Sequence, residues 1–251
     1  MNKLLKYIVK FIKSQSIKLA VKSQKLSSLF LKLEKIIPDL SDQYTSSRLD
    51  EYFRLKVRAQ HAFQISYVLK NIGKPENVLD IGDSSGNHLK YLKFFLPDIN
   101  AISVNLDPRA VDRINKNGGK AVLCDAHKID EAGIKADTAL SFETLEHLEN
   151  PLEFLRNLKK GGFEKVIITV PYRRRSQVGL QQLRNNAENF GIEDVHIFEL
   201  CPEDWILLFR YAGWKVDNFK VYLQYPAYLP FLRFYWEKFD FEGFVGFTLF
   251  K

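Results

Sequence analysis

The stretch VLDIGDSSGNHLKYL, residues 78–92, decides the fold of this chain of 251 residues. Its first residues are apolar apart from Asp80, which is typical of a buried β-strand. Gly82 and Gly86 then flank a tight turn, and a helical pattern begins near Asn87. Glycines let a ligand approach the backbone closely, and the first turn of a helix offers N–H groups to an anion. The stretch therefore predicts a strand, a ligand-binding loop and a helix, in that order.

These glycines do not form the dinucleotide-binding motif G-x-G-x-x-G. That motif needs glycine where this chain has Ser84 and Asn87. The spacing therefore disfavours a nicotinamide-dependent oxidoreductase.

Strand-like runs and helical patterns alternate on both sides of the loop. Alternation of this kind predicts an α/β fold with a doubly wound, mostly parallel sheet, whose ligand site lies at the carboxyl ends of the strands. Helical patterns are found at residues 41–72, 87–95, 108–117 and 151–158. The strand-like runs are residues 77–81, 101–105, 121–124, 138–142, 165–170, 215–223 and 244–250.

The loop after the first strand resembles motif I of the S-adenosylmethionine-dependent methyltransferases with a Rossmann-like fold. In that family the pattern is apolar-apolar-Asp-apolar-Gly-x-Gly-x-Gly. Asp80, Gly82 and Gly86 match this pattern, and Ser84 replaces the middle glycine. Serine is small enough to keep the turn.

The resemblance continues at the ends of the next three strands. Asn105 stands where the family usually has an acid that binds both ribose hydroxyls, and Asp107 follows two residues later. Asp125 and Ala126 match the family's adenine-contacting pair. The block DTALSFETLEHLENP, residues 137–151, is similar to the family's D-x-V-x-S-x-E-x-L-E-H-L-x-x-P stretch. The resemblance covers residues 48–223 and 243–251.

The resemblance implies a Rossmann-like domain with a seven-stranded sheet over residues 39–251, which binds S-adenosyl-L-methionine and acts as a methyltransferase. The acceptor is expected to be a small molecule, a lipid or a glycan precursor. Gly82 is expected to leave room for the methionine portion of the cofactor, so that Gly82→Val would block binding. The implied cofactor-binding residues are Asp80, Gly82, Asp83, Ser84, Gly86, Asn105, Leu106, Asp125, Ala126 and Phe142.

His147 and Glu143 are the candidate catalytic residues. Methyl transfer from a sulfonium is an in-line displacement, so the protein chiefly positions the acceptor and sometimes removes its proton. His147 follows the fourth strand, and an imidazole titrates near neutral pH. If the segment is helical, Glu143 shares a face with His147. The alternative is a structural role, in which a hydrogen bond from His147 holds the loop.

Arg173 and His196 are the candidate acceptor-binding residues. Arg173 opens a run of three arginines directly after the fifth strand, where arginines can hold a phosphate or a carboxylate. His196 precedes the late helical pattern, where family members often contact substrate. The alternatives are a solvated loop and a surface histidine. The aromatic-rich insertion at residues 224–243 either packs against the sheet or the N-terminal segment, or covers the acceptor.

Residues 1–38 form a basic leader with nine lysines and one acid, so its net charge is +8 and that of the remaining chain is −1. Residues 4–13 predict an amphipathic helix with Ile8, Val9 and Phe11 on its apolar face and Lys10 and Lys13 opposite. The apolar face packs on the body or on a second subunit, or it attaches to an anionic membrane surface. Deleting the leader is expected to leave cofactor binding intact.

The composition limits which partners and metal or disulfide sites the chain is expected to have. The neutral body makes a DNA partner unexpected, although a tRNA substrate stays open. Two cysteines without a CxxC pair argue against a disulfide framework, and the five histidines show no metal-ligand spacing, so no metal is expected. These features indicate a cytoplasmic enzyme, located at the inner face of the membrane if the leader attaches there. A non-catalytic protein that binds S-adenosylmethionine or a nucleotide is the second interpretation, since Ser84 and Asn105 depart from the family pattern.

Overall fold

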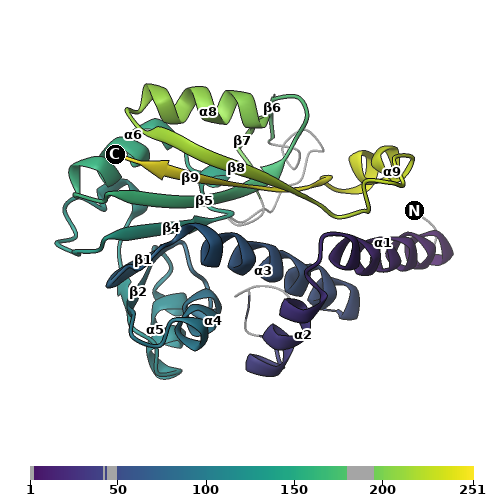
Figure 1. Ribbon diagram of the computed structural model, residues 1–251, viewed down its shortest axis with the longest axis horizontal. Helices are drawn as coiled ribbons and strands as arrows, with labels where there is room; N and C mark the ends of the chain where they lie inside the picture. The colour runs from purple at the N-terminus through teal and green to yellow at the C-terminus, as the bar shows by residue number, and fades with distance from the viewer. Residues whose placement is uncertain (1–2, 42, 44–49, 180–194) are drawn as a thin grey trace.

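The computed structural model describes residues 3–41, 43, 50–179 and 195–251. Its centre is a seven-stranded sheet with the order β3-β2-β1-β4-β5-β9-β8 (Figure 1). The strand pairs from β3 to β5 are parallel, and β9 runs antiparallel to both of its neighbours. The predicted α/β fold with a mostly parallel, doubly wound sheet is therefore confirmed. The strands are β1 (Asn77–Ile81), β2 (Asn100–Asn105), β3 (Ala121–Leu123), β4 (Thr138–Phe142), β5 (Lys165–Tyr172), β8 (Lys215–Leu223) and β9 (Gly243–Phe250), and a separate hairpin pairs β6 (Gln177–Val178) with β7 (Phe198–Glu199).

Helices cover both faces of the sheet, so its central strands are buried on both sides. Val78 packs into a core with α3 and α4, whereas the next residue, Leu79, packs on the opposite face with α6 and α8. The side chains of Asp50, Asp107 and Asn150 accept hydrogen bonds from first-turn N–H groups and fix the starts of α3, α5 and α6. These helices are α3 (Glu51–Asn71), α4 (Asn87–Phe95), α5 (Pro108–Lys116), α6 (Pro151–Lys160) and α8 (Pro202–Tyr211).

The leader packs against the body. Its helices α1 (Lys3–Ser23) and α2 (Ser27–Ile36) lie along α3 (Figure 1). Arg58 of α3 donates a hydrogen bond to the carbonyl oxygen of Leu33 at 3.1 Å. Packing on the body is one of the alternatives that the sequence leaves open for the leader. Because deletion of residues 1–38 would expose this core, we expect the deletion to destabilise the domain. The leader residues buried in the shared core are Ile17, Val21, Leu26 and Leu33.

The faces of α1 differ from those that the sequence predicts. Val9 is buried, but Ile8 and Phe11 are 43% and 56% exposed. Lys13, predicted on the solvated face, is buried and forms an ion pair with Asp240. The predicted division is therefore wrong, because the stripe that contains Val9 and Lys13 is the one that packs on the body. In the described part of the chain, no helix has both the length and the apolar character that a membrane span requires.

The aromatic-rich insertion packs on the leader. Its helix α9 (Leu232–Phe239) lies beside α1 at one end of the molecule (Figure 1). The hydroxyl of Tyr235 donates to the carbonyl oxygen of Val9 at 2.8 Å, and the indole N–H of Trp236 donates to the hydroxyl of Ser16 at 3.0 Å. The leader and the insertion therefore hold each other in place.

Candidate active site

The order of the sheet reverses between β1 and β4, where open α/β sheets bind their ligands. Thr144, two residues beyond β4, connects the ends of the two strands. Its hydroxyl donates a hydrogen bond to the carbonyl oxygen of Ile81 at 3.2 Å. The loop after β1 and the segment after β4 therefore form the two sides of one site.

Asp83 fixes the shape of the loop after β1. Its Oδ1 accepts hydrogen bonds from the backbone N–H groups of Ser85 and Gly86 at 3.0 and 2.7 Å, and its Oδ2 accepts one from the hydroxyl of Ser103 at 2.8 Å. The residue is buried. Its carboxylate is therefore used within the protein, where it holds the turn after β1.

Glycine is required at position 82 for a different reason from the one that the sequence suggests. Its φ is +88°, a conformation that favours glycine, and an added Cβ would lie 2.3 Å from Oγ1 of Thr144. The space beside Gly82 is thus taken by Thr144. The prediction that Gly82→Val would act by filling ligand space is wrong, because the substitution would first disturb the loop itself.

Gln43, which the sequence analysis does not identify, covers the same loop. Its backbone carbonyl accepts a hydrogen bond from the hydroxyl of Ser84 at 2.6 Å, and its side-chain oxygen accepts one from the amide of Asn87 at 2.8 Å. Gln43 is buried. No local pattern marks this contact, since the two segments are about 40 residues apart in the sequence.

Asn105 connects the end of β2 to the loop. Its amide nitrogen donates to the carbonyl oxygen of Asp83 at 2.9 Å, and its side-chain oxygen accepts from the N–H of Asp107 at 2.8 Å. Asp107 begins α5 and pairs with Arg109 at 3.0 Å, and hydrogen bonds from Arg109 hold the pKa of Asp107 below its usual range. Leu106 between them is 59% exposed and offers an apolar contact.

Asp125 and Ala126 follow β3 at the same edge of the sheet. The Asp125 carboxylate accepts a hydrogen bond from the backbone N–H of His127 at 3.0 Å, and so begins the short 3₁₀ helix η1 (Ala126–Lys128). This bond lowers the pKa of Asp125. Ala126 packs at the border of the core. The adenine-binding role of the pair stays a prediction.

Asp80 forms a buried pair with His88, another residue that the sequence analysis does not identify. Oδ2 of Asp80 lies 3.4 Å from Nδ1 of His88, and Nε2 of His88 lies 3.1 Å from the side-chain oxygen of Gln64 in α3. Burial, with the charge of Asp83, raises the pKa of Asp80 to about 6. Burial opposes the charge of His88, but Asp80 outweighs it and raises the pKa of the imidazole. The two groups therefore form a buried pair beneath the loop, in which each shifts the pKa of the other.

Phe142 and Glu143 mark the end of β4. The ring of Phe142 is buried and stands edge-on to His88, with 4.7 Å between the centroids. Glu143 has a φ of +50°, which is uncommon outside glycine and is found at functional sites. Burial raises the pKa of Glu143 well above its usual range.

His147 does not share a helical face with Glu143, so that expectation is wrong. The segment forms only a 3₁₀ turn, η2 (Leu145–His147), and Glu143 precedes it in its left-handed conformation. The acidic neighbour is Glu146, whose Oε1 lies 3.9 Å from Nε2 of His147. Nδ1 of His147 lies 2.8 Å from the carbonyl oxygen of Val195. A carbonyl only accepts, so Nδ1 carries the hydrogen, and in the neutral imidazole Nε2 carries the lone pair.

His196 lies against His147, with perpendicular rings and 4.8 Å between their centroids. Nδ1 of His196 is 3.1 Å from Glu199, and the guanidinium of Arg173 is 2.8 Å from the same carboxylate. The fold thus brings Arg173 and His196 next to the segment after β4. Arg173 is engaged by Glu199, and the next arginine, Arg174, pairs with Glu242 at 2.8 Å.

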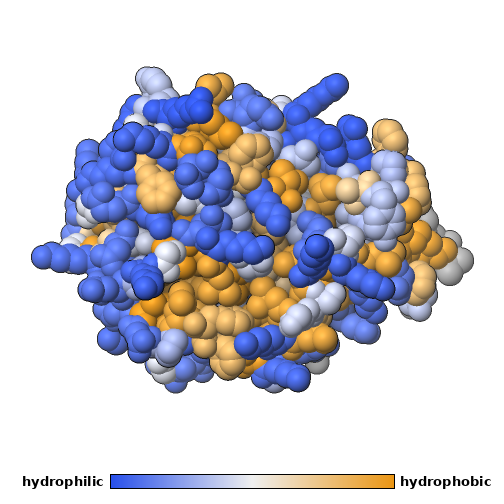
Figure 2. All heavy atoms as spheres, viewed as in Figure 1, coloured by the Kyte–Doolittle hydropathy of each residue, from blue (hydrophilic) through white to orange (hydrophobic). Residues whose placement is uncertain are grey.

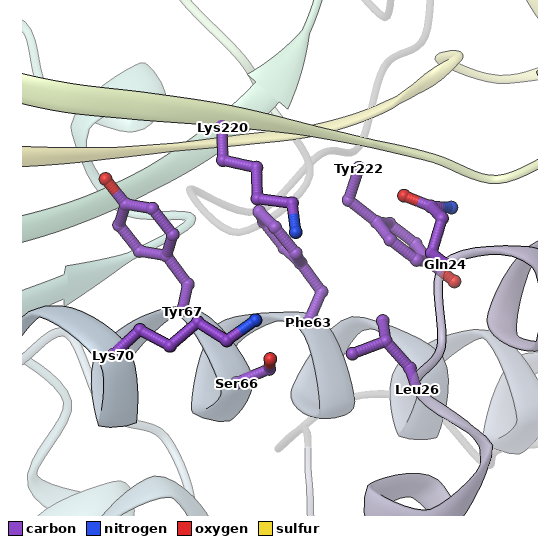
Figure 3. A pocket seen from close by; sticks show the side chains of 8 residues that line it. All are labelled: Gln24, Leu26, Phe63, Ser66, Tyr67, Lys70, Lys220 and Tyr222. Atoms are coloured by element: carbon purple, nitrogen blue, oxygen red, sulfur yellow. The ribbon is translucent and has the colours of Figure 1, made fainter.

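A separate small pocket lies between α3, β8 and the turn that joins α1 to α2 (Figure 3). Phe63 and Tyr222 line it, and Lys70 and Lys220 approach it from α3 and β8. None of the predicted site residues contributes to its lining.

A family model described as a methyltransferase domain matches residues 53–218 of the chain. A comparison with curated proteins finds no match.

Several solved structures share the fold. The [4+2]-cyclase SpnF is 12% identical, with 93% of this chain and 96% of that chain covered and a TM-score of 0.60. A SAM-dependent methyltransferase from Archaeoglobus fulgidus is 18% identical, and the match covers 80% of this chain and 100% of that chain with a TM-score of 0.51. The O-methyltransferase from a trans-AT PKS multienzyme of Brevibacillus brevis, in complex with S-adenosyl-L-homocysteine, is 13% identical, with 79% and 74% covered and a TM-score of 0.54.

Proposed function

The chain belongs to the methyltransferase-domain family, and from this premise we propose that it transfers the methyl group of S-adenosyl-L-methionine to a small-molecule, lipid or glycan-precursor acceptor. The family makes the chain a class I methyltransferase. The cofactor is assigned to the carboxyl ends of β1, β2 and β3, where Gly82, Asn105 and Asp125 lie. The acceptor is assigned to the neighbouring segment after β4.

The contact between Thr144 and Ile81 supports this proposal most strongly. It holds the segment of residues 143–147 against the predicted cofactor loop, at 3.2 Å between the two oxygens. A cofactor bound along the loop would then lie beside the segment that carries His147. In the transfer, the acceptor's lone pair forms the bond to the methyl carbon while the carbon–sulfur bond breaks, and Nε2 of His147 takes the acceptor's proton.

The second candidate function is a non-catalytic protein that binds the same cofactor. Asn105 favours it, because both ends of its side chain already bond within the protein and a ribose would compete for them. The cyclase SpnF is a solved structure of this fold that is described by a reaction other than methyl transfer. Calorimetric titration with S-adenosylmethionine, S-adenosylhomocysteine and NAD tests the shared part of both candidates. The first two should bind at one per chain, and failure of both to bind would refute the assignment.

We also propose that α1 and α9 attach the enzyme to an anionic membrane surface. Tyr7 and Phe11 of α1 are 71% and 56% exposed, and Phe231 and Phe234 at α9 are 64% and 70% exposed. Apolar residues are visible on the surface at this end of the molecule (Figure 2). Exposed aromatic side chains beside a lysine-rich helix suit the interface of an anionic membrane.

A further inference from the structure

A cluster of one buried carboxylate and two half-buried imidazoles lies in the segment proposed to hold the acceptor. Glu146 is 0% exposed, and neither of its carboxylate oxygens has a hydrogen-bond partner among the residues that the structure describes. One ligand atom each from Glu146, His147 and His196 lies within 4.8 Å of the others. A buried carboxylate without partners is costly, so this arrangement calls for a compensating group.

The two imidazoles are oriented as metal ligands are. Nδ1 of His147 donates to the carbonyl oxygen of Val195 at 2.8 Å, and Nδ1 of His196 faces Glu199 at 3.1 Å. Histidines that bind a metal usually donate their other ring N–H to a carbonyl or a carboxylate, which fixes the tautomer. In both residues, Nε2 is therefore the nitrogen that carries a lone pair.

Glu199 is itself held in place by charge. Its carboxylate lies 2.8 Å from the guanidinium of Arg173 and accepts a hydrogen bond from Gln177 at 2.7 Å. A carboxylate that is itself held in place behind His196 gives the imidazole the supporting shell found in metal sites.

We propose that Glu146, His147 and His196 bind a divalent first-row transition cation, with Zn²⁺ as the representative ion. Two imidazoles and one carboxylate are a donor set that these cations prefer. The ligand atoms of a tetrahedral zinc site lie about 3.4 Å apart. The distance of 3.9 Å between Oε1 of Glu146 and Nε2 of His147 is close to this value, and the three ligand atoms, which lie within 4.8 Å of one another, would have to move closer together around the ion.

The surroundings of Glu146 also favour a cation. Two further carboxylates, those of Glu143 and Glu199, lie close enough to interact with the charge of Glu146. The other mixed cluster of the described chain, formed by Asp80, Asp83 and His88, differs from this one, because both oxygens of Asp83 already accept hydrogen bonds.

Three protein ligands leave one coordination position open, which is typical of catalytic sites. This last step rests on the proposed function: the open position takes an acceptor oxygen, and the acceptor is a hydroxyl compound. With the cation bound, Nε2 of His147 would be a ligand and not the base. The cation would lower the pKa of the acceptor hydroxyl, whose proton would pass to solvent, and the acceptor oxygen would then form the bond to the methyl carbon while the carbon–sulfur bond breaks.

The test is calorimetric titration of the full-length, EDTA-treated protein with Zn²⁺. We expect one ion per chain, and a loss of at least about tenfold in affinity for both His196→Ala and Glu146→Gln. His127→Ala, at a histidine outside the cluster, should bind as the parent protein does. Circular dichroism checks the fold of each variant. If Glu146→Gln does not fold, the zinc affinity of His196→Ala alone decides the test.

Absence of stoichiometric Zn²⁺ binding would overturn the proposal, as would wild-type affinity in a folded His196→Ala variant. Titration of the metal-free protein with S-adenosylmethionine, on the same samples, reports separately on the proposed function. Failure of the metal site and failure of the cofactor site are therefore distinguishable.

Discussion

Nε2 of His147 lies 3.9 Å from Oε1 of Glu146, in the segment after β4 that the hydroxyl of Thr144 connects to the end of β1. The imidazole is oriented through Nδ1 by the carbonyl oxygen of Val195 at 2.8 Å. The base and the ligand roles of His147 both need Nε2, whereas the structural role needs only Nδ1. A variant that removes Nε2 but keeps a donor in place of Nδ1 therefore distinguishes a chemical role of His147 from a structural one.

His147→Asn keeps an N–H donor near the Val195 carbonyl and removes Nε2. We expect turnover to fall by about 10²–10⁴ while the affinity for S-adenosylmethionine changes little, because the proton-accepting or ligating nitrogen is lost. Steady-state kinetics and calorimetry measure the two quantities. Full turnover in a folded His147→Asn variant would assign His147 a structural role only.

Gly82→Ala should lower the free energy of unfolding by about 2–4 kcal/mol, because it combines backbone strain with a collision against Thr144. The matched control is Gly118→Ala. Gly118 has a φ of +78°, but an added Cβ there meets no atom within 4 Å, so only the strain of about 1–2 kcal/mol applies. Urea unfolding gives both values. Equal losses in the two variants would show that Thr144 does not constrain the loop.

Asp240 should make folding stability depend on pH. Burial opposes its charge, but Lys56 and Lys13 outweigh burial and lower its pKa from 3.8 to about 2. A folded-state pKa below the unfolded value stabilises the protein above pH 4, and this contribution is lost as the pH falls through about 2. For Asp240 alone it amounts to about 2 kcal/mol at pH 7. The net value of the ion pair is smaller, because burial also lowers the pKa of Lys13.

The measurement is urea unfolding of Asp240→Asn between pH 7 and pH 3. The variant should be less stable than the parent at pH 7, and the difference should shrink by about 1 kcal/mol at pH 3. Asp112→Asn, which removes an exposed ion pair with Lys116, should cost no more than about 0.5 kcal/mol. A difference for Asp240→Asn that does not change with pH would contradict the pKa shift.

The proposed membrane surface predicts that the full-length protein sediments with anionic vesicles and is released by high salt. The double variant Phe11→Ser/Phe234→Ser should sediment at least about tenfold more weakly, because two exposed aromatic side chains are lost from this surface. Leu207→Ser is the matched control, since Leu207 is 61% exposed on α8. Equal sedimentation of the double variant and the parent, or no sedimentation of the parent at low salt, would refute attachment through α1 and α9.

The sheet could be predicted because its signals are local. β1 and α4 have the predicted bounds, since an apolar run and two glycines mark where the strand ends and the helix begins. β5 continues to Tyr172, beyond the predicted end at residue 170, because Pro171 lies opposite Phe244 in the antiparallel pair with β9. That pairing is not visible in the sequence around Pro171.

The cluster of Glu146, His147 and His196 could not be predicted from spacing, because 50 residues separate Glu146 from His196. The apolar periodicity likewise predicts a helix at the start of the leader, but it does not predict which face of that helix packs on the body. Lys13 is buried because it forms an ion pair with Asp240 on the body, and a helical wheel of the leader contains no information about Asp240.

Hydrogen–deuterium exchange with and without S-adenosylhomocysteine tests the assigned cofactor site most directly. The account predicts slower exchange in peptides that cover residues 80–86, 104–107 and 125–126, with no change in α8 at residues 202–211. Protection confined to other elements, such as those around the pocket of Figure 3, or no protection at all at a saturating concentration, would contradict it.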